Sequence, residues 1–151
     1  MKNVYEYRHV VLPEEIDTQG HVNNTCYVGW MQDAAIAHSA SLGWTDERYQ
    51  RIGAMWVARE HRIEYLHPTF LGDTIVIQTW VATMQKVRST RKYRMIRESD
   101  GVIVSEAETL WAFVDMKSGR LTRVTEEVIA AFPEASISPE ELNETPRSVA
   151  S

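Results

Sequence analysis

Cysteine is nearly absent from this chain of 151 residues, in which Cys26 is the only one. A single cysteine excludes an intrachain disulfide, and it also excludes zinc or iron–sulfur sites that are built from several thiolates. A chain of this length can bury the core of one domain without such crosslinks. The shortage of cysteine therefore favours a reducing, cytoplasmic setting.

Long apolar runs and a surplus of basic charge are also missing. No stretch of about 18 apolar residues occurs, and the N-terminal segment lacks the apolar core of a signal peptide. The formal net charge is −5, whereas a general nucleic-acid binder needs a basic face to neutralise phosphates. We therefore expect no export, no membrane insertion and no nucleic-acid partner.

Several motifs of hydrolases and cofactor enzymes are absent as well. The five histidines include no pair spaced i, i+4 with a glutamate between, which is the pattern of zinc hydrolases. The chain has no Gly-x-Ser-x-Gly elbow of an α/β-hydrolase and no glycine-rich phosphate loop. The sequence thus predicts no metal site and no bound cofactor.

The hydrophobic pattern changes from strand to helix and back to strand along the chain. Residues 5–11 alternate as a first strand, and residues 25–42 carry apolar side chains three or four apart, with Asn24 as the expected N-cap. A short helix is expected near 45–51. Antiparallel strands are then predicted at about 55–66, 73–84, 87–98 and 102–116. The pair Asp100-Gly101 is a hairpin signal between the last two of these strands. A last short strand and a helix near 125–132 are expected to follow. This order predicts an α+β fold in which a curved antiparallel sheet wraps one long central helix.

Residues 1–132 form the predicted domain, and its sheet is too large for a single long helix to cover. Strands of about twelve residues with large apolar side chains on both faces indicate that a second subunit buries part of the sheet. We therefore expect a homodimer or a homotetramer. The tail from 133 to 151 is rich in Glu, Ser and Pro, lacks periodicity and is expected to be loosely ordered.

The segment Asp17-Thr18-Gln19-Gly20-His21-Val22-Asn23-Asn24 gathers polar groups just before the long helix begins. An acidic side chain can act there as a base or nucleophile. Backbone N–H groups at the helix start, aided by the helix dipole, can stabilise an oxygen that gains negative charge. Hydrolysis of a thioester needs both a base or nucleophile and a donor that stabilises the developing negative charge. A loop aspartate is also common in Asx-turns and helix caps, which carry no chemistry.

At these residues the sequence resembles the acyl-CoA and acyl-carrier-protein thioesterases of the hotdog superfamily, in the branch that includes hydroxybenzoyl-CoA thioesterase. The resemblance rests on Asp17, Gly20 and Tyr27, and on the strand Ile63-Glu64-Tyr65-Leu66-His67-Pro68 with Gly72-Asp73 after it. It covers roughly residues 5 to 132 in element order. The run His21-Val22-Asn23-Asn24 is more similar to the carrier-protein thioesterases than to the enzymes for aromatic CoA thioesters.

The resemblance implies a hotdog fold and an enzyme that cleaves a fatty or related acyl-CoA to the free acid and CoA. Asp17 would be the catalytic carboxylate, which acts either as a base on water or as a nucleophile through a transient anhydride. The backbone N–H of Asn24 would polarise the thioester carbonyl. In such enzymes the active site lies between subunits, which agrees with the expected homodimer.

Three other functions stay open on the same residues. The substrate can be a thioester of acyl carrier protein, although the negative net charge disfavours docking of an acidic carrier. Dehydratases of the same superfamily act on hydroxyacyl thioesters and pair a histidine with an acidic residue, but His21 lies in the wrong register for that pairing. A non-catalytic module that binds acyl thioesters would keep its ligand after Asp17 is removed.

Neighbouring residues are weighed between a ligand role and a structural one. His21 is expected to orient the loop as part of the catalytic group. Asn23 and Tyr27 are candidate substrate contacts, although Asn23 is suited to brace backbone and Tyr27 and Trp30 have the spacing of core residues. Cys26 lies near a helix N-terminus, where a thiol can become nucleophilic, but small buried cysteines are common and the resemblance places no nucleophile there.

A group of basic residues lies on and around one predicted strand. Because CoA and phosphopantetheine both carry phosphates, arginines at an exposed strand edge can supply the positive charge that the whole chain lacks. Arg88 and Arg91 are the candidates for this contact with substrate, although alternating charges on a strand also mark a solvated face. The full group is Lys86, Arg88, Arg91, Lys92, Arg94 and Arg97.

Overall fold

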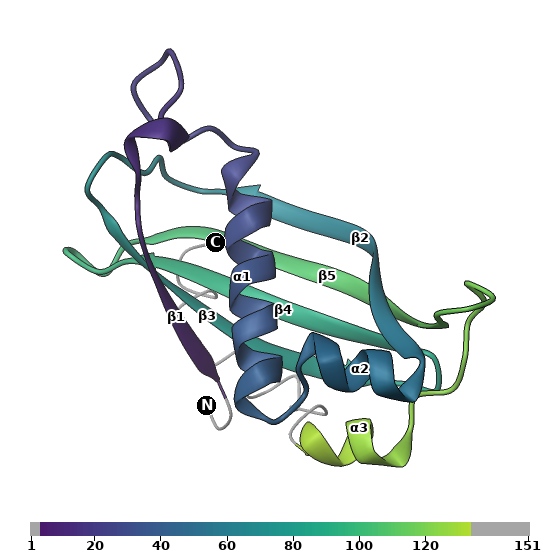
Figure 1. The fold of residues 1–151 in the computed structure, drawn as a ribbon. Coiled ribbons are helices and arrows are strands. Elements are labelled where there is room, and N and C mark those ends of the chain that lie inside the picture. The colour runs from purple at the N-terminus through teal and green to yellow at the C-terminus, as the bar shows by residue number, and fades with distance from the viewer. Residues whose placement is uncertain (1–3, 134–151) are drawn as a thin grey trace.

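The computed structural model describes residues 4–133, in which an antiparallel sheet curves around one long helix (Figure 1). The helix is α1 (Cys26–Ser41), and it crosses the concave face of the sheet. The predicted α+β arrangement is therefore confirmed. Most of the predicted tail at 133–151 lies outside the described residues.

The sheet has five strands in the hydrogen-bonded order β1-β3-β4-β5-β2, and every neighbouring pair is antiparallel. This order leaves β1 and β2 as the two edges. The strands are β1 (Tyr5–Val10), β2 (Ala54–Tyr65), β3 (Thr74–Met84), β4 (Arg88–Arg97) and β5 (Ile103–Asp115). The remaining elements are the 3-10 turn η1 (Pro13–Glu15) and the short helices α2 (Asp46–Ile52) and α3 (Glu126–Ala131).

Two local predictions need correction. The N-cap of α1 is Thr25 rather than Asn24, because the Asn23 side-chain Oδ1 accepts hydrogen bonds from both the Thr25 N–H (2.9 Å) and the Thr25 hydroxyl (2.7 Å) and fixes the turn before the helix. The expected last short strand is reduced to a single bridge between Val114 and Leu121. No helix among residues 4–133 has both the length and the apolar character needed to cross a membrane.

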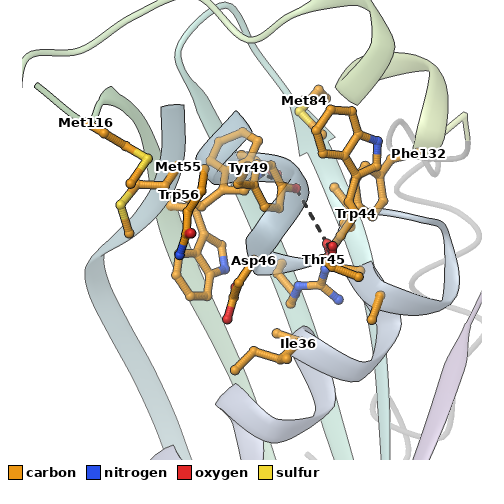
Figure 2. Close-up of a pocket in the computed structure, with 18 residues that line it drawn as sticks. Ile36, Trp44, Thr45, Asp46, Tyr49, Met55, Trp56, Met84, Met116 and Phe132 are labelled. Atoms are coloured by element: carbon orange, nitrogen blue, oxygen red, sulfur yellow. Dashed lines mark hydrogen bonds between the residues drawn. The ribbon is translucent and has the colours of Figure 1, made fainter. Parts of the chain in front are cut away.

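Two apolar clusters form the core. The first packs α1 side chains such as Trp30, Met31 and Ala34 against the inward face of β3, β4 and β5. Met31 is fully buried, which removes its side chain from water and is worth about 1.5–3 kcal/mol. The second cluster joins α2 and α3 to the other end of the sheet; Figure 2 includes three of its rings, those of Trp44, Tyr49 and Phe132. The first cluster thus packs α1 against the sheet, and the second packs α2 and α3 against it.

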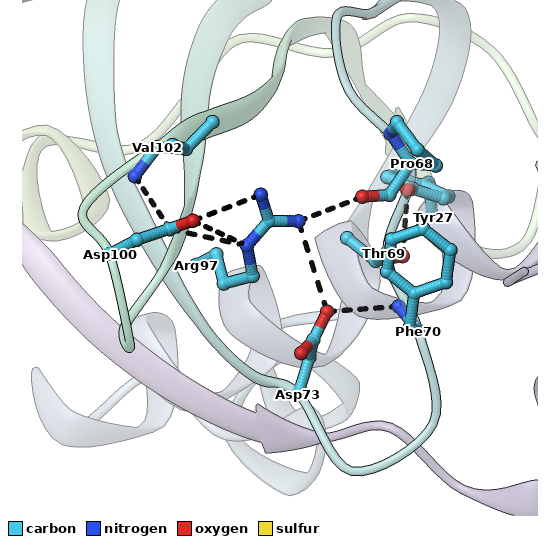
Figure 3. Close-up of polar contacts among 8 residues, drawn as sticks. All are labelled: Tyr27, Pro68, Thr69, Phe70, Asp73, Arg97, Asp100 and Val102. Atoms are coloured by element: carbon cyan, nitrogen blue, oxygen red, sulfur yellow. Dashed lines mark hydrogen bonds and ion pairs between the residues drawn. The ribbon is translucent and has the colours of Figure 1, made fainter.

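Arg97 ties the turn between β2 and β3 to the hairpin between β4 and β5 (Figure 3). Its guanidinium donates to the Pro68 carbonyl at 2.9 Å and to the Asp100 carboxylate at 3.1 Å, and it lies 3.9 Å from the Asp73 carboxylate. The same carboxylates accept backbone N–H bonds from Val102 and Phe70. Arg97 therefore has a structural role, and it fixes the turn against which the N-terminal loop packs.

Substitution Arg97→Met is expected to lower the free energy of unfolding by about 2–4 kcal/mol, because it leaves two carboxylates and a carbonyl without their shared donor. The control is Arg8→Met, since Arg8 is 60% exposed and forms an ion pair with Glu98 at the surface. That change is expected to leave the free energy of unfolding nearly unchanged, because water screens the exposed pair. Chemical denaturation of the three proteins measures the difference, and equal midpoints for both variants would refute the assigned role.

Candidate active site

Asp17 lies in a tight loop that is closed at its base by backbone contacts. Ile16 and Val22 form an isolated antiparallel bridge. The Asp17 N–H donates to the His21 carbonyl at 2.8 Å, and the Gly20 N–H donates to the Asp17 carbonyl at 3.1 Å. Gly20 has a φ of 89°, a left-handed conformation that glycine adopts without a steric penalty. The loop sequence thus makes a closed turn with Asp17 at its start.

The Asp17 carboxylate has one oxygen engaged in the turn and one directed towards His21. Its Oδ1 accepts the Gln19 N–H at 2.8 Å, which is the Asx-turn expected of a structural aspartate. Its Oδ2 lies 3.6 Å from the His21 Nδ1, and the side chain is 23% exposed. The structure therefore brings Asp17 and His21 together and leaves the carboxylate accessible to water.

Glu15 holds this loop to the rest of the domain. This role is not among those predicted from the sequence. Its carboxylate accepts hydrogen bonds from the Leu12 N–H (2.8 Å) and the Trp30 indole N–H (2.7 Å), and it contacts the His9 Nε2 at 2.7 Å. Its carbonyl accepts the Asn23 N–H at 2.9 Å. Burial raises the pKa of the Glu15 carboxyl, but the bonds from Leu12, His9 and Trp30 outweigh it, so the pKa is lowered and the group stays ionised.

The start of α1 presents a backbone donor beside this loop. Within residues 4–133, the Asn24 N–H has no hydrogen-bond acceptor, whereas the Thr25 N–H is taken by the Asn23 side chain and the Cys26 N–H by the Asn23 carbonyl. The Tyr65 hydroxyl donates to the Asn24 carbonyl at 3.0 Å and fixes this residue from β2. Asn23 braces the backbone here, and its contact with substrate stays a prediction.

Tyr27 lies behind the helix start rather than on its surface. The side chain is 2% exposed, and its hydroxyl is 2.9 Å from the Thr69 hydroxyl. Its ring packs against those of Trp30 and Tyr65, with centroids 4.7 and 5.0 Å away. These contacts explain the helical spacing of Tyr27 in the sequence. Its assignment as a substrate contact stays a prediction.

A cavity of about 530 Å³ lies at the other end of α1, between α1, α2 and the sheet. Figure 2 shows Trp44 and Phe132 on one side of it and Met55 and Trp56 on the other. Most of the lining side chains are apolar, and few are hydroxyls or amides. A cavity of this size with apolar walls is typical of a small-molecule site.

Arg91 is part of the wall of this cavity, so its predicted place at an exposed strand edge is wrong. β4 is paired on both sides, by β3 and by β5, and residue 91 faces inward. The side chain is 5% exposed, and its Nη1 donates to the His38 Nδ1 at 2.9 Å and to the Thr79 hydroxyl at 3.1 Å.

Arg88 differs from Arg91 because it is exposed at the beginning of β4. It lies with Lys86 and Arg123 around a shallow groove. Of the other basic residues on β4, Arg94 lies 3.7 Å from the Glu106 carboxylate and Arg97 serves the turns described above. The predicted basic group is therefore not uniform: its members Arg91, Arg94 and Arg97 make contacts within the fold, Lys86 and Arg88 are exposed, and Lys92 is half-buried.

His38 is buried beneath Arg91 and is neutral. Burial and the nearby Arg91 charge lower its pKa from the usual 6.5 to about 4. Its ring stacks on Tyr5 with centroids 5.1 Å apart and meets Phe132 edge-on at 5.8 Å. The neutral ring accepts the Arg91 hydrogen bond through Nδ1, and it cannot supply a negative charge to that arginine.

Comparison with known proteins gives a family match over most of the chain. The model of the thioesterase-like superfamily matches residues 11–132. A chloroplastic acyl-[acyl-carrier-protein] hydrolase of Cuphea viscosissima is 31% identical over 104 residues, which are 64% of this chain and 25% of the relative. The chain thus spans only a quarter of the length of that protein.

Solved structures confirm the predicted hotdog fold. A 1,4-dihydroxy-2-naphthoyl-CoA thioesterase from Synechocystis superposes with a TM-score of 0.77 at 12% identity, over 91% of this chain and 98% of that one. An acyl-ACP thioesterase from Bacteroides thetaiotaomicron superposes with a TM-score of 0.74 at 19% identity, over 80% of this chain and 49% of that one.

The buried neutral state of His38 predicts a pH dependence of stability. Because the pKa is 6.5 when unfolded and about 4 when folded, the stabilising contribution is complete above pH 6.5 and is lost as the pH falls from 6.5 to 4. The loss is expected to reach about 3 kcal/mol. In His38→Gln the amide oxygen can still accept from Arg91 but does not titrate, so the slope of unfolding free energy against pH should flatten in this window. Identical slopes for native and variant protein would contradict the account.

Proposed function

Since the chain belongs to the thioesterase-like superfamily, we propose that it hydrolyses an acyl thioester, releasing a free acid and a thiol. The observation that supports this most strongly is the occurrence, in one short segment, of a solvent-accessible Asp17 carboxylate and of an Asn24 N–H that has no acceptor within residues 4–133. The carboxylate is a base or nucleophile, and the N–H of Asn24 is the donor for the thioester oxygen. We propose acyl-CoA as the substrate class.

The proposed reaction runs through a tetrahedral intermediate. Asp17 removes a proton from water as the water oxygen attacks the carbonyl carbon. Alternatively, the Asp17 oxygen attacks directly, the C–S bond breaks to give an anhydride and the thiolate, and water then cleaves the anhydride. Negative charge develops on the carbonyl oxygen, where the Asn24 N–H and the positive end of the α1 dipole stabilise it. The thiolate then leaves and takes up a proton. His21, 3.6 Å from Asp17, orients the carboxylate.

The free edge of β2 is the proposed contact with a second copy of the chain. β2 has twelve residues and, among the described strands, is hydrogen-bonded only to β5, so one row of its backbone groups faces outward (Figure 1). A long open edge strand invites pairing with another strand. Antiparallel pairing of two β2 strands about a two-fold axis would complete one continuous sheet across a homodimer.

The same symmetry would bring the two ends of α1 together across the interface. Met55 and Trp56, at the start of β2, line the apolar cavity, whereas Tyr65, at its end, contacts Asn24. In a two-fold antiparallel pair, the start of one strand lies opposite the end of the other. The cavity of one subunit would then adjoin the reactive loop of its neighbour, which provides an acyl site for each carboxylate.

We propose CoA as the carrier of the acyl group, because the protein has an exposed basic cluster. Lys86, Arg88 and Arg123 form the exposed basic cluster around a shallow groove, where they can bind the phosphates of CoA. A thioester of acyl carrier protein is the second candidate, because the Cuphea relative is a hydrolase of that substrate. Thiol release from both carriers, measured side by side, distinguishes the two.

Substitution Asp17→Asn is expected to lower kcat for thiol release by at least about 100-fold, because the amide keeps the size of the side chain but is neither a base nor a nucleophile. Asp33→Asn is the matched control, since Asp33 is an exposed residue of α1 away from the loop and should keep native activity. A panel of short, medium, long and aromatic acyl-CoA substrates provides the assay. Full activity of Asp17→Asn would refute the catalytic role.

Sedimentation equilibrium at micromolar concentration tests the proposed homodimer. The expected mass is at least twice that of the 17.4 kDa chain, because the β2 edge and the apolar side chains Met55 and Tyr65 remain exposed in one protomer. A homotetramer would also be compatible, since it can contain the same dimer. A monomer under these conditions would contradict the proposed site between subunits.

A further inference from the structure

The cavity beside the second half of α1 contains a buried positive charge that the proposed hydrolysis does not use. Arg91 is 5% exposed and is part of a wall that otherwise consists largely of aromatic and methionine side chains. Within residues 4–133, no carboxylate forms an ion pair with Arg91. Among the residues that the structure describes, the guanidinium therefore has no counter-ion.

Its neutral partners leave most of its donors unused. A guanidinium has five N–H donors on three nitrogens, and only Nη1 of Arg91 has acceptors among the described residues, namely His38 and Thr79. A buried cation without a counter-ion is costly to a folded protein, because the lost hydration is not replaced. Such a group is stabilised when a ligand brings an anion into the cavity.

The other polar groups of the lining do not provide a buried positive charge for an anionic ligand. The Ser39 hydroxyl donates to the Trp44 carbonyl at 2.7 Å, and the Ser89 hydroxyl donates to the Thr83 carbonyl at 2.8 Å. Asp46 and Gln50 are exposed residues of α2, where water screens them. Arg91 is thus the charged group on the interior side of a largely apolar space.

We propose that this cavity binds the distal end of an acyl group that carries a carboxylate, so that the protein acts on ω-carboxyacyl thioesters. The inference rests on the hydrolase function proposed above and names its substrate class. The apolar walls would hold the methylene chain, and the free nitrogens of Arg91 would bind the terminal carboxylate through charge-assisted hydrogen bonds. A methyl terminus at the same place would leave the guanidinium unpaired.

The dimensions of the helix agree with an elongated ligand. Ala35, the first α1 residue of the cavity lining, follows Asn24 by eleven positions, which corresponds to about 16 Å along the helix axis. Within one subunit, a chain attacked at the helix start would have to extend over that distance. Across the proposed β2 interface, the loop of the second subunit would approach the cavity more directly.

Binding can be measured without hydrolysis, because Trp44, Trp56 and Trp111 line the cavity and report on it by fluorescence. A medium-chain alkanoic acid and its methyl ester are titrated into the native protein. The acid is expected to bind about 10- to 100-fold more tightly than the ester. Arg91→Met should abolish this difference, whereas Arg91→Lys should retain part of it and Arg8→Met, at an exposed arginine of β1, should retain all of it. Equal binding of acid and ester to the native protein would overturn the inference without recourse to any variant.

Hydrolysis then tests the substrate class. The kcat/KM for an ω-carboxyacyl-CoA is expected to exceed that for the methyl-ended acyl-CoA of equal length by about 10- to 100-fold, and Arg91→Met should remove the difference while keeping turnover of the methyl-ended substrate. Equal turnover of both substrates by the native protein would overturn the inference and leave the hydrolase function intact. Selective binding of the acid with no thiol release from either substrate would instead overturn the hydrolase function and leave the carboxylate site in place.

Discussion

The carboxylate of Glu15 joins three segments that lie apart in the sequence. It receives the His9 side chain from β1, the Leu12 N–H that begins η1 and the Trp30 indole of α1, each at 2.7 or 2.8 Å. Its own carbonyl holds the Asn23 N–H, so the chain that leaves η1 must return to the same point after the Asp17 loop. The position of Asp17 relative to the start of α1 depends on this one partly buried anion. Without this carboxylate, the loop would keep backbone contacts such as the Ile16–Val22 bridge and the hydrogen bonds of Val22 and Asn23 to the Thr69 and Glu15 carbonyls, but no side-chain link to β1 and α1 through Glu15.

Local sequence patterns predict most of the helices and strands, because each pattern reflects a structural requirement of the same short segment. The spacing of Trp30, Met31 and Ala34 reflects burial of one helix face, and Asp100-Gly101 marks the hairpin because Gly101 adopts a φ of 72°. Resemblance to a family identifies Asp17 as a candidate, and its proposed catalytic role is compatible with the Asx-turn that the structure shows. Glu15 could not be found in this way, since its partners are brought together only by the tertiary fold.

The prediction that Arg91 lies at an exposed strand edge is wrong, although the alternation of residues along β4 indicates that its side chain is buried. Residues 89, 91, 93 and 95 share one face of β4, and Tyr93 and Met95 are core residues. Period-two alternation therefore assigns Arg91 to the buried face, while Arg88 and Lys92 belong to the other. Charge alone suggested a solvated strand edge. The pairing of β4 on both sides, which decides the matter, depends on strand order, and one sequence does not specify that order.

Both ends of α1 contribute to the proposed activity. The N-terminal end offers a carboxylate and a free N–H, and the C-terminal half borders a cavity with a buried cation. Each part has a structural explanation of its own. The proposed cleavage of a thioester whose acyl chain ends in a carboxylate would use both.

The central claim is that this chain breaks a thioester with an oxygen from water. A single-turnover reaction in ¹⁸O-labelled water, with protein in excess over acyl-CoA, tests it directly by mass spectrometry of the acid. The account predicts free acid and free CoA. Label in the acid is expected when water attacks the thioester carbon, and label in the Asp17 carboxyl group is expected when an anhydride forms and water attacks at Asp17. Recovery of intact acyl-CoA, bound but unlabelled and uncleaved, would contradict it.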